Sequence, residues 1–241
     1  MTTTQNWNRL ARELGDVLAL AAPPVAITFG ATPPDGVEAF DDPMPAPMPD
    51  GRTGRVPAGC AFWVKSVDRT FSTVAEDHGN CSVGSLTHGF KTLDEVAGNS
   101  DVAALLDTGW ITMDVVPQIP VVSGKPGSVT YGPLADTPVD PDVVLLRVNG
   151  KQLMVLHDAM PDMHLEGKPQ CHIVALAKEQ GVVAASVGCA LSRVRTGMSA
   201  NEMTCAIPAG KLPDVLAALS STASADGQVA SYAGEDALRF S

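Results

Sequence analysis

The stretch Cys81-Ser-Val-Gly-Ser-Leu-Thr-His-Gly89 has a counterpart later in the chain, Cys189-Ala-Leu-Ser-Arg-Val-Arg-Thr-Gly197. In each copy another cysteine comes first, Cys60 or Cys171, and a helix-like stretch and a β-like run follow it. The offset between the copies is 111 residues at the first cysteine and 108 residues at both the second cysteine and the glycine. This near-constant offset predicts an internal repeat of strand, helix, strand and cysteine turn.

The repeat has consequences for the domain organisation. We expect residues 1–241 to form a single domain of two related lobes, approximately 22–135 and 136–222. Residues 25–90 should superpose on residues 143–198. If the lobes pack about a pseudo-twofold axis, the four repeated cysteines converge on one site between them. An acidic residue also follows each copy, Glu95 and Glu202, at an offset of 107.

The composition limits the class of protein. The chain has 241 residues, of which 45% are hydrophobic and 18% charged, and a chain of this length buries about 70–75% of its unfolded surface. The net charge of −11 disfavours nucleic acid as a partner. The longest apolar stretch, residues 17–30, contains two prolines and is too short to span a membrane. Five cysteines without a secretory signal favour the reducing cytoplasm, and a homo-oligomer is compatible with the sequence.

Helical and strand-like segments alternate along the chain. Apolar spacing predicts helices at 6–20, 61–67, around 102–106 with Ser100 as N-cap, 152–160 and 172–180. Strands are expected at 25–29, 70–75, 129–131, 141–148, 182–187 and 203–207, and residues 40–58 read as a loop. Pro213 suits the first turn of a last helix. This order predicts an α+β or α/β fold with a mixed sheet, flanking helices and two pseudo-symmetric repeats.

Cys81 carries the first chemical hypothesis. Asn80 before it is a good helix N-cap, and a thiol in the first helical turn has its pKa lowered by the macrodipole. Such a thiol should be unusually reactive, and His78 or His88 could act as its base. A buried structural cysteine is the alternative for each site taken singly.

A metal centre is the second hypothesis. Cys60, Cys81, Cys171 and Cys189 match the four thiolates of an iron–sulfur cluster such as 4Fe–4S, with zinc or haem as alternatives. Imidazoles of His78, His88 or His172 could replace a thiolate. The chain has no CxxC motif, so convergence would have to come from distant loops.

Two further residues are candidate substrate contacts. Arg193 and Thr196 lie in a cluster of basic and hydroxyl side chains, and a guanidinium suits a carboxylate or phosphate. The alternative is that an arginine of this cluster pairs with Glu202. Cys205 has no counterpart in the repeat and is assigned to the core.

The chain also resembles a known family, the domain of unknown function 169, whose bacterial and archaeal members are noted for cysteines. The segments that carry the resemblance are residues 24–28, Gly59-Cys-Ala-Phe-Trp63, Ala75–Cys81, Thr87-His-Gly89, Tyr131-Gly-Pro-Leu134, Pro141–Val144 and Gly188–Arg193. They span most of residues 20–220, and the chain has cysteine at all four positions of the pattern. The Met- and Pro-rich insertion at 43–58 departs from it. The resemblance implies no particular reaction.

Three functions are therefore compatible with the sequence. The first is a cytoplasmic protein whose inter-lobe cysteines hold a metal or iron–sulfur cluster for a redox (oxidoreductase) or lyase-type reaction on a small molecule. The second is a metal-free thiol enzyme with Cys81 as nucleophile. The third is a non-catalytic module that binds or senses a small molecule.

Overall fold

The computed structural model describes residues 6–167 and 169–240, and within them one mixed sheet of seven strands forms the centre. The strand order is β2-β3-β1-β4-β7-β6-β5. Neighbouring strands are antiparallel except β5 and β6, which are parallel. The strands are β1 (Val25–Gly30), β2 (Phe71–Thr73), β3 (Ser128–Pro133), β4 (Val143–Val148), β5 (His164–Glu166), β6 (Ala184–Ser186) and β7 (Met203–Pro208). The predicted α+β class with a mixed sheet is confirmed.

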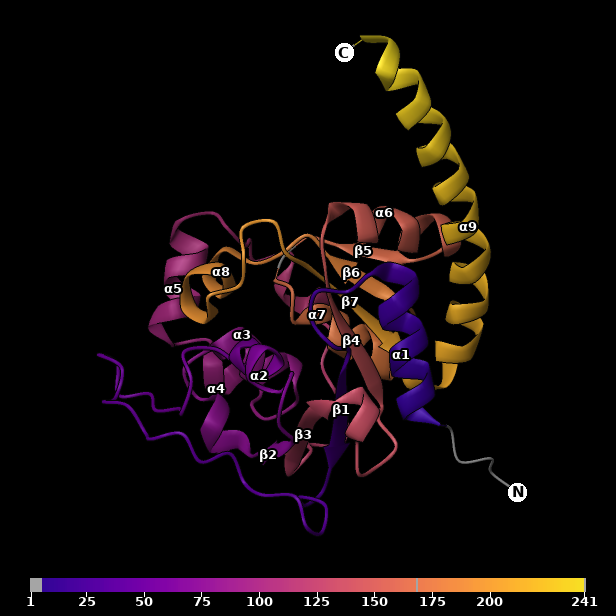
Figure 1. Ribbon diagram of the computed structural model, residues 1–241. Coiled ribbons are helices and arrows are strands. Elements are labelled where there is room, and N and C mark those ends of the chain that lie inside the picture. The colour runs from indigo at the N-terminus through magenta and orange to yellow at the C-terminus, as the bar shows by residue number, and fades with distance from the viewer. Residues whose placement is uncertain (1–5, 168, 241) are drawn as a thin grey trace.

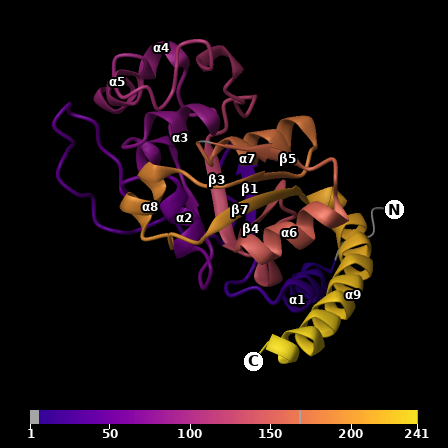
Figure 2. The ribbon, with the colours of Figure 1, turned by 90° about the horizontal axis from the view of Figure 1, so that it is seen from above.

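Helices cover both faces of the sheet (Figure 1). One face, called here the α1/α9 face, carries α1 (Trp7–Leu18), α6 (Gly150–Ala159) and α9 (Leu212–Ala237). The opposite α2/α7 face carries α2 (Cys60–Lys65) and α7 (His172–Ala175). Four short helices lie further out on that side (Figure 2): α3 (Ser82–Thr87), α4 (Leu93–Val96), α5 (Ser100–Asp107) and α8 (Ala190–Thr196).

The central strand β4 shows how the sequence divides between the two faces. Val143 and Leu145 belong to the core under α2 and α7, whereas Val144 and Leu146 belong to the core under α1, α6 and α9. All four are fully buried. Because successive side chains of a strand point to opposite faces, a continuous apolar run suits a strand that is covered on both.

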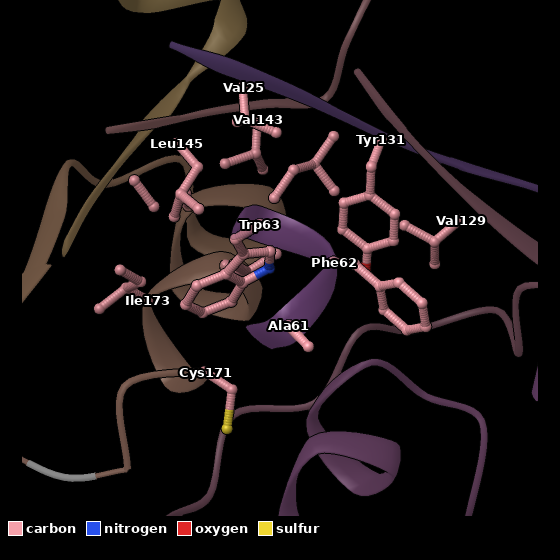
Figure 3. Packing of buried hydrophobic residues seen from close by; sticks show 14 of the residues in the cluster. Val25, Ala61, Phe62, Trp63, Val129, Tyr131, Val143, Leu145, Cys171 and Ile173 are labelled. Atoms are coloured by element: carbon pink, nitrogen blue, oxygen red, sulfur yellow. The ribbon is translucent and has the colours of Figure 1, made fainter. Parts of the chain in front are cut away.

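The core of the α2/α7 face is built around two aromatic residues of α2 (Figure 3). Phe62 stacks on Tyr131 of β3 with 5.5 Å between ring centroids. Trp63 is fully buried next to the strand residues Val143 and Leu145 (Figure 3). Cys171 lies at the margin of this packing, and its sulfur points away from the strands (Figure 3). These contacts fix the first turn of α2, and with it Cys60.

The first and last helices pack together on the α1/α9 face. Asn6 caps α1 through its side chain, which accepts a hydrogen bond from the Arg9 amide. Pro213 lies in the first turn of α9, as predicted. The second half of α9 extends beyond the sheet in Figure 1 and exposes Val229 and Tyr232. Over the described residues, no helix has the length and apolar character needed to cross a membrane.

Apart from β5, which has no counterpart, the strand order is the same on the two sides of the β1–β4 junction. Reading outward from this pair, the order is β1-β3-β2 on one side and β4-β7-β6 on the other. In each half a helix is followed along the chain by a short strand and then by a cysteine that precedes a second helix. These are α2, β2 and Cys81 in the first half, and α7, β6 and Cys189 in the second. This arrangement agrees with a duplication, and the superposition of the two halves stays a prediction.

Several local expectations need correction. The N-cap of α3 is Cys81 itself, whereas the Asn80 amide donates to the Gly54 and Val56 carbonyls and holds the preceding loop. Ser100 is the first residue of α5 and Asn99 is its cap. The three-residue strand β5 and the short helix α4 were not predicted, because neither is long enough to show a hydrophobic period. The helix expected at 172–180 continues from α7 into a π-helical turn at Leu176–Gln180.

Candidate functional site

The four repeated cysteines all lie at the starts of helices. Cys60 is the first residue of α2, Cys81 is the N-cap of α3, Cys171 is the N-cap of α7, and Cys189 is the N-cap of α8. Cys81 and Cys189 share an extended backbone conformation, with φ of −130° and −132°. Cys81 and Cys189 therefore occupy corresponding helix positions, whereas Cys60 lies one residue further into its helix than Cys171 does.

The four side chains line one small cavity of about 30 Å³ on the α2/α7 face. The other polar side chains that line it are His88, Gln170 and Ser192. The rest of the wall is formed by Ala58, Gly59, Val83, Gly84, Leu105, Trp110, Pro169 and Leu191. Cys171 and Cys189 are 9% and 7% exposed, whereas Cys60 and Cys81 keep more accessible surface. None of the five cysteines is in a disulfide. The sequence separates these thiols widely, and the fold brings them together.

A buried carboxylate fixes the start of α3. Asp101 of α5 accepts hydrogen bonds from the Ser82 amide at 2.9 Å and the Ser82 hydroxyl at 2.6 Å. Its other neighbour is the Arg52 guanidinium, 3.1 Å away. Asp101 is only 8% exposed, so this ion pair lies largely out of water. The contacts hold Cys81, which immediately precedes Ser82, at the cavity.

The turn before Cys189 requires a glycine. Gly188 has φ of +122°, a region that other residues rarely adopt. A Cβ atom at this position would also meet the Arg193 guanidinium at 2.5 Å. The chain can therefore turn from β6 into α8 and place Cys189 at the cavity.

The surroundings of Cys60, Cys81 and Cys171 keep these three thiols protonated at neutral pH. Burial raises the pKa of Cys60 to about 12, although hydrogen bonding from Ser192 partly offsets the effect. Burial also raises the pKa of Cys81, and hydrogen bonding from the Gly84 backbone N–H partly offsets this effect. Burial raises the pKa of Cys171 as well, and a hydrogen bond with the Thr87 hydroxyl partly offsets it. Mutual repulsion of the thiolates adds to each shift. The pKa lowering predicted for Cys81 from the helix dipole is therefore wrong, because desolvation outweighs the field of a six-residue helix.

Two buried histidines lie near the cavity. His88 lines it and is 1% exposed; its Nδ1 is 3.0 Å from the Gly84 carbonyl oxygen. Burial lowers the pKa of His88 to about 4. His78 is 5.5 Å from His88 between ring centroids, and its Nε2 is 3.0 Å from the Thr73 hydroxyl. Burial lowers the pKa of His78 as well. Both imidazoles are therefore neutral at pH 7.

The predicted substrate residues make contacts within the protein. The Arg193 guanidinium donates to the Val187 carbonyl at 2.9 Å and also to the Ser199 carbonyl. The Thr196 hydroxyl donates to the Ser192 carbonyl at 2.8 Å. Neither Arg193 nor Thr196 is among the cavity-lining residues. Their role as ligand contacts stays a prediction.

The acidic residues that follow the two copies have different roles. Glu95 accepts from Thr92 in the capping box of α4. Glu202 makes a two-point ion pair with Arg147 of β4, at 2.6 and 2.8 Å. Glu202 therefore pairs with an arginine outside the cluster that the sequence singled out. His172 is buried, with Nδ1 3.6 Å from Glu166, and does not line the cavity.

Sequence reasoning named Ser192 only as part of the basic and hydroxyl cluster, and it did not place Ser192, Gln170 or Thr87 beside the sulfurs. The Gln170 amide donates to the Ser192 hydroxyl at 2.7 Å, which places a hydrogen-bond chain beside Cys60. The Thr87 hydroxyl likewise forms a hydrogen bond with the Cys171 thiol. Ser192 and Thr87 both lie inside the repeated segments, so their position in the repeat was the available signal.

The cavity does not have the geometry of a single-ion metal site. Over residues 6–167 and 169–240, no group of three or more His, Cys, Asp or Glu side chains is arranged so that it could hold a metal ion. Four sulfurs bound to one zinc ion at 2.3 Å stand roughly 3.8 Å apart in a tetrahedron. The thiols share one cavity without forming this closed arrangement. A mononuclear zinc site is therefore not supported by the geometry.

Comparison with known proteins identifies the family. The model of the domain of unknown function 169 (DUF169), described as uncharacterised ArCR, matches residues 13–218. No curated protein and no solved structure matches the chain. The match includes all four cavity cysteines and covers well over half of the sequence, so the chain belongs to this family.

Proposed function

We propose that this member of the domain of unknown function 169 family holds an iron–sulfur cluster, or another multinuclear soft-metal centre, in the cavity formed by its four repeated cysteines. The ligands would be Cys60, Cys81, Cys171 and Cys189. The centre would serve a redox or lyase-type reaction on a small molecule. The observation that carries the proposal is that four thiols from two distant parts of the chain line one buried cavity.

Thiol chemistry supports a cation in this cavity. Without a cation, the apolar wall makes ionisation of each thiol costly, and a neighbouring thiolate adds to this cost. The pKa values of Cys60, Cys81 and Cys171 are raised for these reasons. A soft metal ion stabilises the thiolate form outright and displaces the protons. A gathering of four thiols, two of them buried, has no comparable advantage in hydrophobic packing, because larger apolar side chains fill a core better.

The proposal is a cluster and not a single ion. In a 4Fe–4S cluster each cysteine binds a different iron, so the four sulfurs stand further apart than around one zinc ion. The four thiols line one cavity, and among the described residues no group of them is arranged to hold a single ion. Binding would still require adjustment, since a cavity of about 30 Å³ has room for about two water molecules. The short helices α3 and α8 carry two of the ligands on their first turns and are the elements that would shift.

The thiol-enzyme hypothesis is less well supported. A cysteine nucleophile acts as the thiolate, and burial raises the pKa of Cys81. We therefore rank it below the metal centre. We further propose a cytoplasmic location, since all five cysteines are unpaired and a reducing compartment keeps them so. Nucleic acid is not a proposed partner, because the net charge is −11.

Anaerobic purification tests the proposal. We expect the full-length protein to be coloured, with stoichiometric iron and acid-labile sulfide and a sulfur-to-iron charge-transfer band. Serine at any of the four cavity positions should bleach this band, whereas Cys205→Ser should not. Colourless protein with neither stoichiometric iron nor another soft metal would refute the proposal.

A further inference from the structure

The last helix, α9, packs against the rest of the protein over its first half only. Four apolar side chains of this half are buried on the α1/α9 face, namely Leu212, Val215, Leu216 and Leu219, and Ala223 is the last apolar residue that packs against the same core. Of the described residues 224–240 none is buried. This segment, called here the projecting half of α9, extends beyond the sheet and the other helices (Figure 1).

The projecting half is amphipathic. With 3.6 residues per turn, its polar side chains fall on one side, namely Ser224, Gln228, Ser231 and Glu235. The other side contains Ala225, Val229, Tyr232, Ala233 and Phe240. Val229 is 66% exposed, Tyr232 is 71% exposed and Phe240 is 86% exposed. These three large apolar side chains therefore share one exposed side.

Local propensity does not account for a helix in this segment. Gly227 and Gly234 lie inside it, and glycine is the least favourable helical residue after proline. Helices of fewer than about 12–15 residues are marginal in water, and in proteins most helical stability comes from packing of an apolar face. The apolar side of the projecting half is therefore the part that a partner should cover.

We propose that this side pairs with the same segment of a second copy of the chain, with the two helices antiparallel about a twofold axis. Charge selects the register. Asp226 and Arg239 lie near opposite ends of the projecting half, so antiparallel pairing brings Asp226 to the partner's Arg239, and the twofold axis makes this contact twice.

The same register matches the sizes of the facing side chains. It places Phe240 opposite the partner's Ala225, and Tyr232 opposite the partner's Ala233. Each large side chain then meets a small one, which lets the two helices approach closely. The projecting half thus complements itself in both charge and shape.

The charge of the segment disfavours a lipid surface as the occupant. Helices that lie on membranes carry many Lys and Arg residues on their polar side. The projecting half has three acidic residues, Asp226, Glu235 and Asp236, and its basic residue is Arg239. Tyr232 and Phe240 together expose on the order of 300 Å² per copy. Interfaces below about 1,200 Å² in total are typical of weak association, so we expect a dimer that dissociates at micromolar concentration.

The pairing is independent of the cysteine cavity. The family match covers residues 13–218, so the projecting half lies outside it. The α1/α9 face, from which this segment extends, is opposite the α2/α7 face that carries the cavity. Substitutions in the projecting half should therefore leave the metal content unchanged, and failure of either proposal leaves the other standing.

Sedimentation equilibrium of the full-length protein tests the proposal. From about 1 to about 100 μM, we expect the average mass to rise from that of the 25.0 kDa chain toward twice this value. Tyr232→Glu puts a charge at the centre of the interface and should raise the dimer dissociation constant at least about tenfold. The matched control is Gln228→Glu, which adds the same charge on the polar side and should associate like wild type.

Charge reversal tests the register. Asp226→Arg and Arg239→Asp should each weaken association, and the double variant should restore it. In a parallel pair each residue would face its own copy, so the double variant would stay weak and would overturn the antiparallel arrangement. A monomer at about 100 μM, or a dimer that Tyr232→Glu does not weaken, would overturn the proposal. So would a monomer that sediments with phosphatidylglycerol vesicles, because the occupant would then be lipid. The substituted residues lie outside the buried core, and far-ultraviolet circular dichroism checks that each variant is folded.

Discussion

Cysteine occurs on both faces of the sheet, and the two faces surround it differently. On the α1/α9 face Cys205 is fully buried in an apolar core, and burial alone raises its pKa to about 12. On the α2/α7 face four cysteines meet across one cavity, whose wall also contains a hydroxyl, an amide and an imidazole. Burial and a raised pKa are common to both faces. What distinguishes a candidate functional cysteine here is the presence of other thiols and polar side chains around it.

Serine substitution should separate the two faces most clearly. We expect Cys189→Ser to retain no more than about a tenth of the wild-type metal, because a hydroxyl is a poor ligand for soft metals. Cys205→Ser should bind metal normally but lose about 1–3 kcal/mol of unfolding free energy, because it buries a hydroxyl among apolar groups. Elemental analysis and urea denaturation of the metal-stripped proteins measure the two effects. Equal metal contents in the two variants would remove the distinction between the faces.

The α2/α7 face should also depend on the ion pair that positions Cys81. In Asp101→Asn the acceptor for the Ser82 amide and hydroxyl is weakened, and Arg52 loses one of its two carboxylate partners and keeps only Asp50. We expect a loss of about 2–4 kcal/mol of unfolding free energy, somewhat below the usual value for a fully buried pair. The metal content should fall as well, because α3 carries Cys81.

Asp236→Asn is the control for this variant. Asp236 pairs with Arg239 on an exposed turn at 3.1 Å, where the loss should stay below about 0.5 kcal/mol. Denaturation curves and metal analysis of both variants give the comparison. A loss in Asp101→Asn no larger than in Asp236→Asn would show that α3 does not depend on this contact.

The sequence predicted the longer strands well because they are apolar runs, whereas the three-residue strand β5 was missed. Residues 141–148 contain β4, residues 203–207 contain most of β7, and the helix expected at 6–20 contains α1. The order of the strands could not be predicted, because pairing depends on contacts between distant segments. The symmetric order about β1 and β4 is therefore new information from the structure.

For the site, the repeat offset identified which cysteines belong together, and the structure brings those four to one cavity. The local chemistry was predicted less well. Asn80 is a residue type that commonly caps helices, but its side chain donates to a carbonyl of the preceding loop. The pKa of Cys81 was expected to be lowered and is raised instead, because the thiol is desolvated. Burial depends on tertiary packing, which a local motif does not reveal.

The pH dependence of stability gives the finest comparison of the two faces. The pKa values of Cys60, Cys81, Cys171 and Cys205 are raised by folding, so their stabilising contribution is complete below the pKa of the unfolded thiol, about 8.5. It is lost as the pH rises toward the folded pKa, at up to about 1.4 kcal/mol per pH unit for each thiol. Metal-stripped protein should therefore lose stability steeply as the pH rises from about 8.5 toward about 12, the folded pKa of Cys60 and Cys205.

Metal loading should remove the part of this pH-dependent slope that comes from the cavity thiols on the α2/α7 face. Cavity thiols that bind metal are already deprotonated in the folded state, so their part of the slope disappears and only that of Cys205 remains. Cys205→Ala should accordingly reduce the slope in both forms. Cys60→Ala, which is expected not to bind the metal, is compared with the wild type in the metal-stripped form, where it should reduce the slope. Urea denaturation at half-unit steps of pH measures the slopes. If the loaded and stripped proteins lost stability equally with pH, the cavity thiols would not be the groups that bind the metal, and the four cysteines would differ from Cys205 only in position.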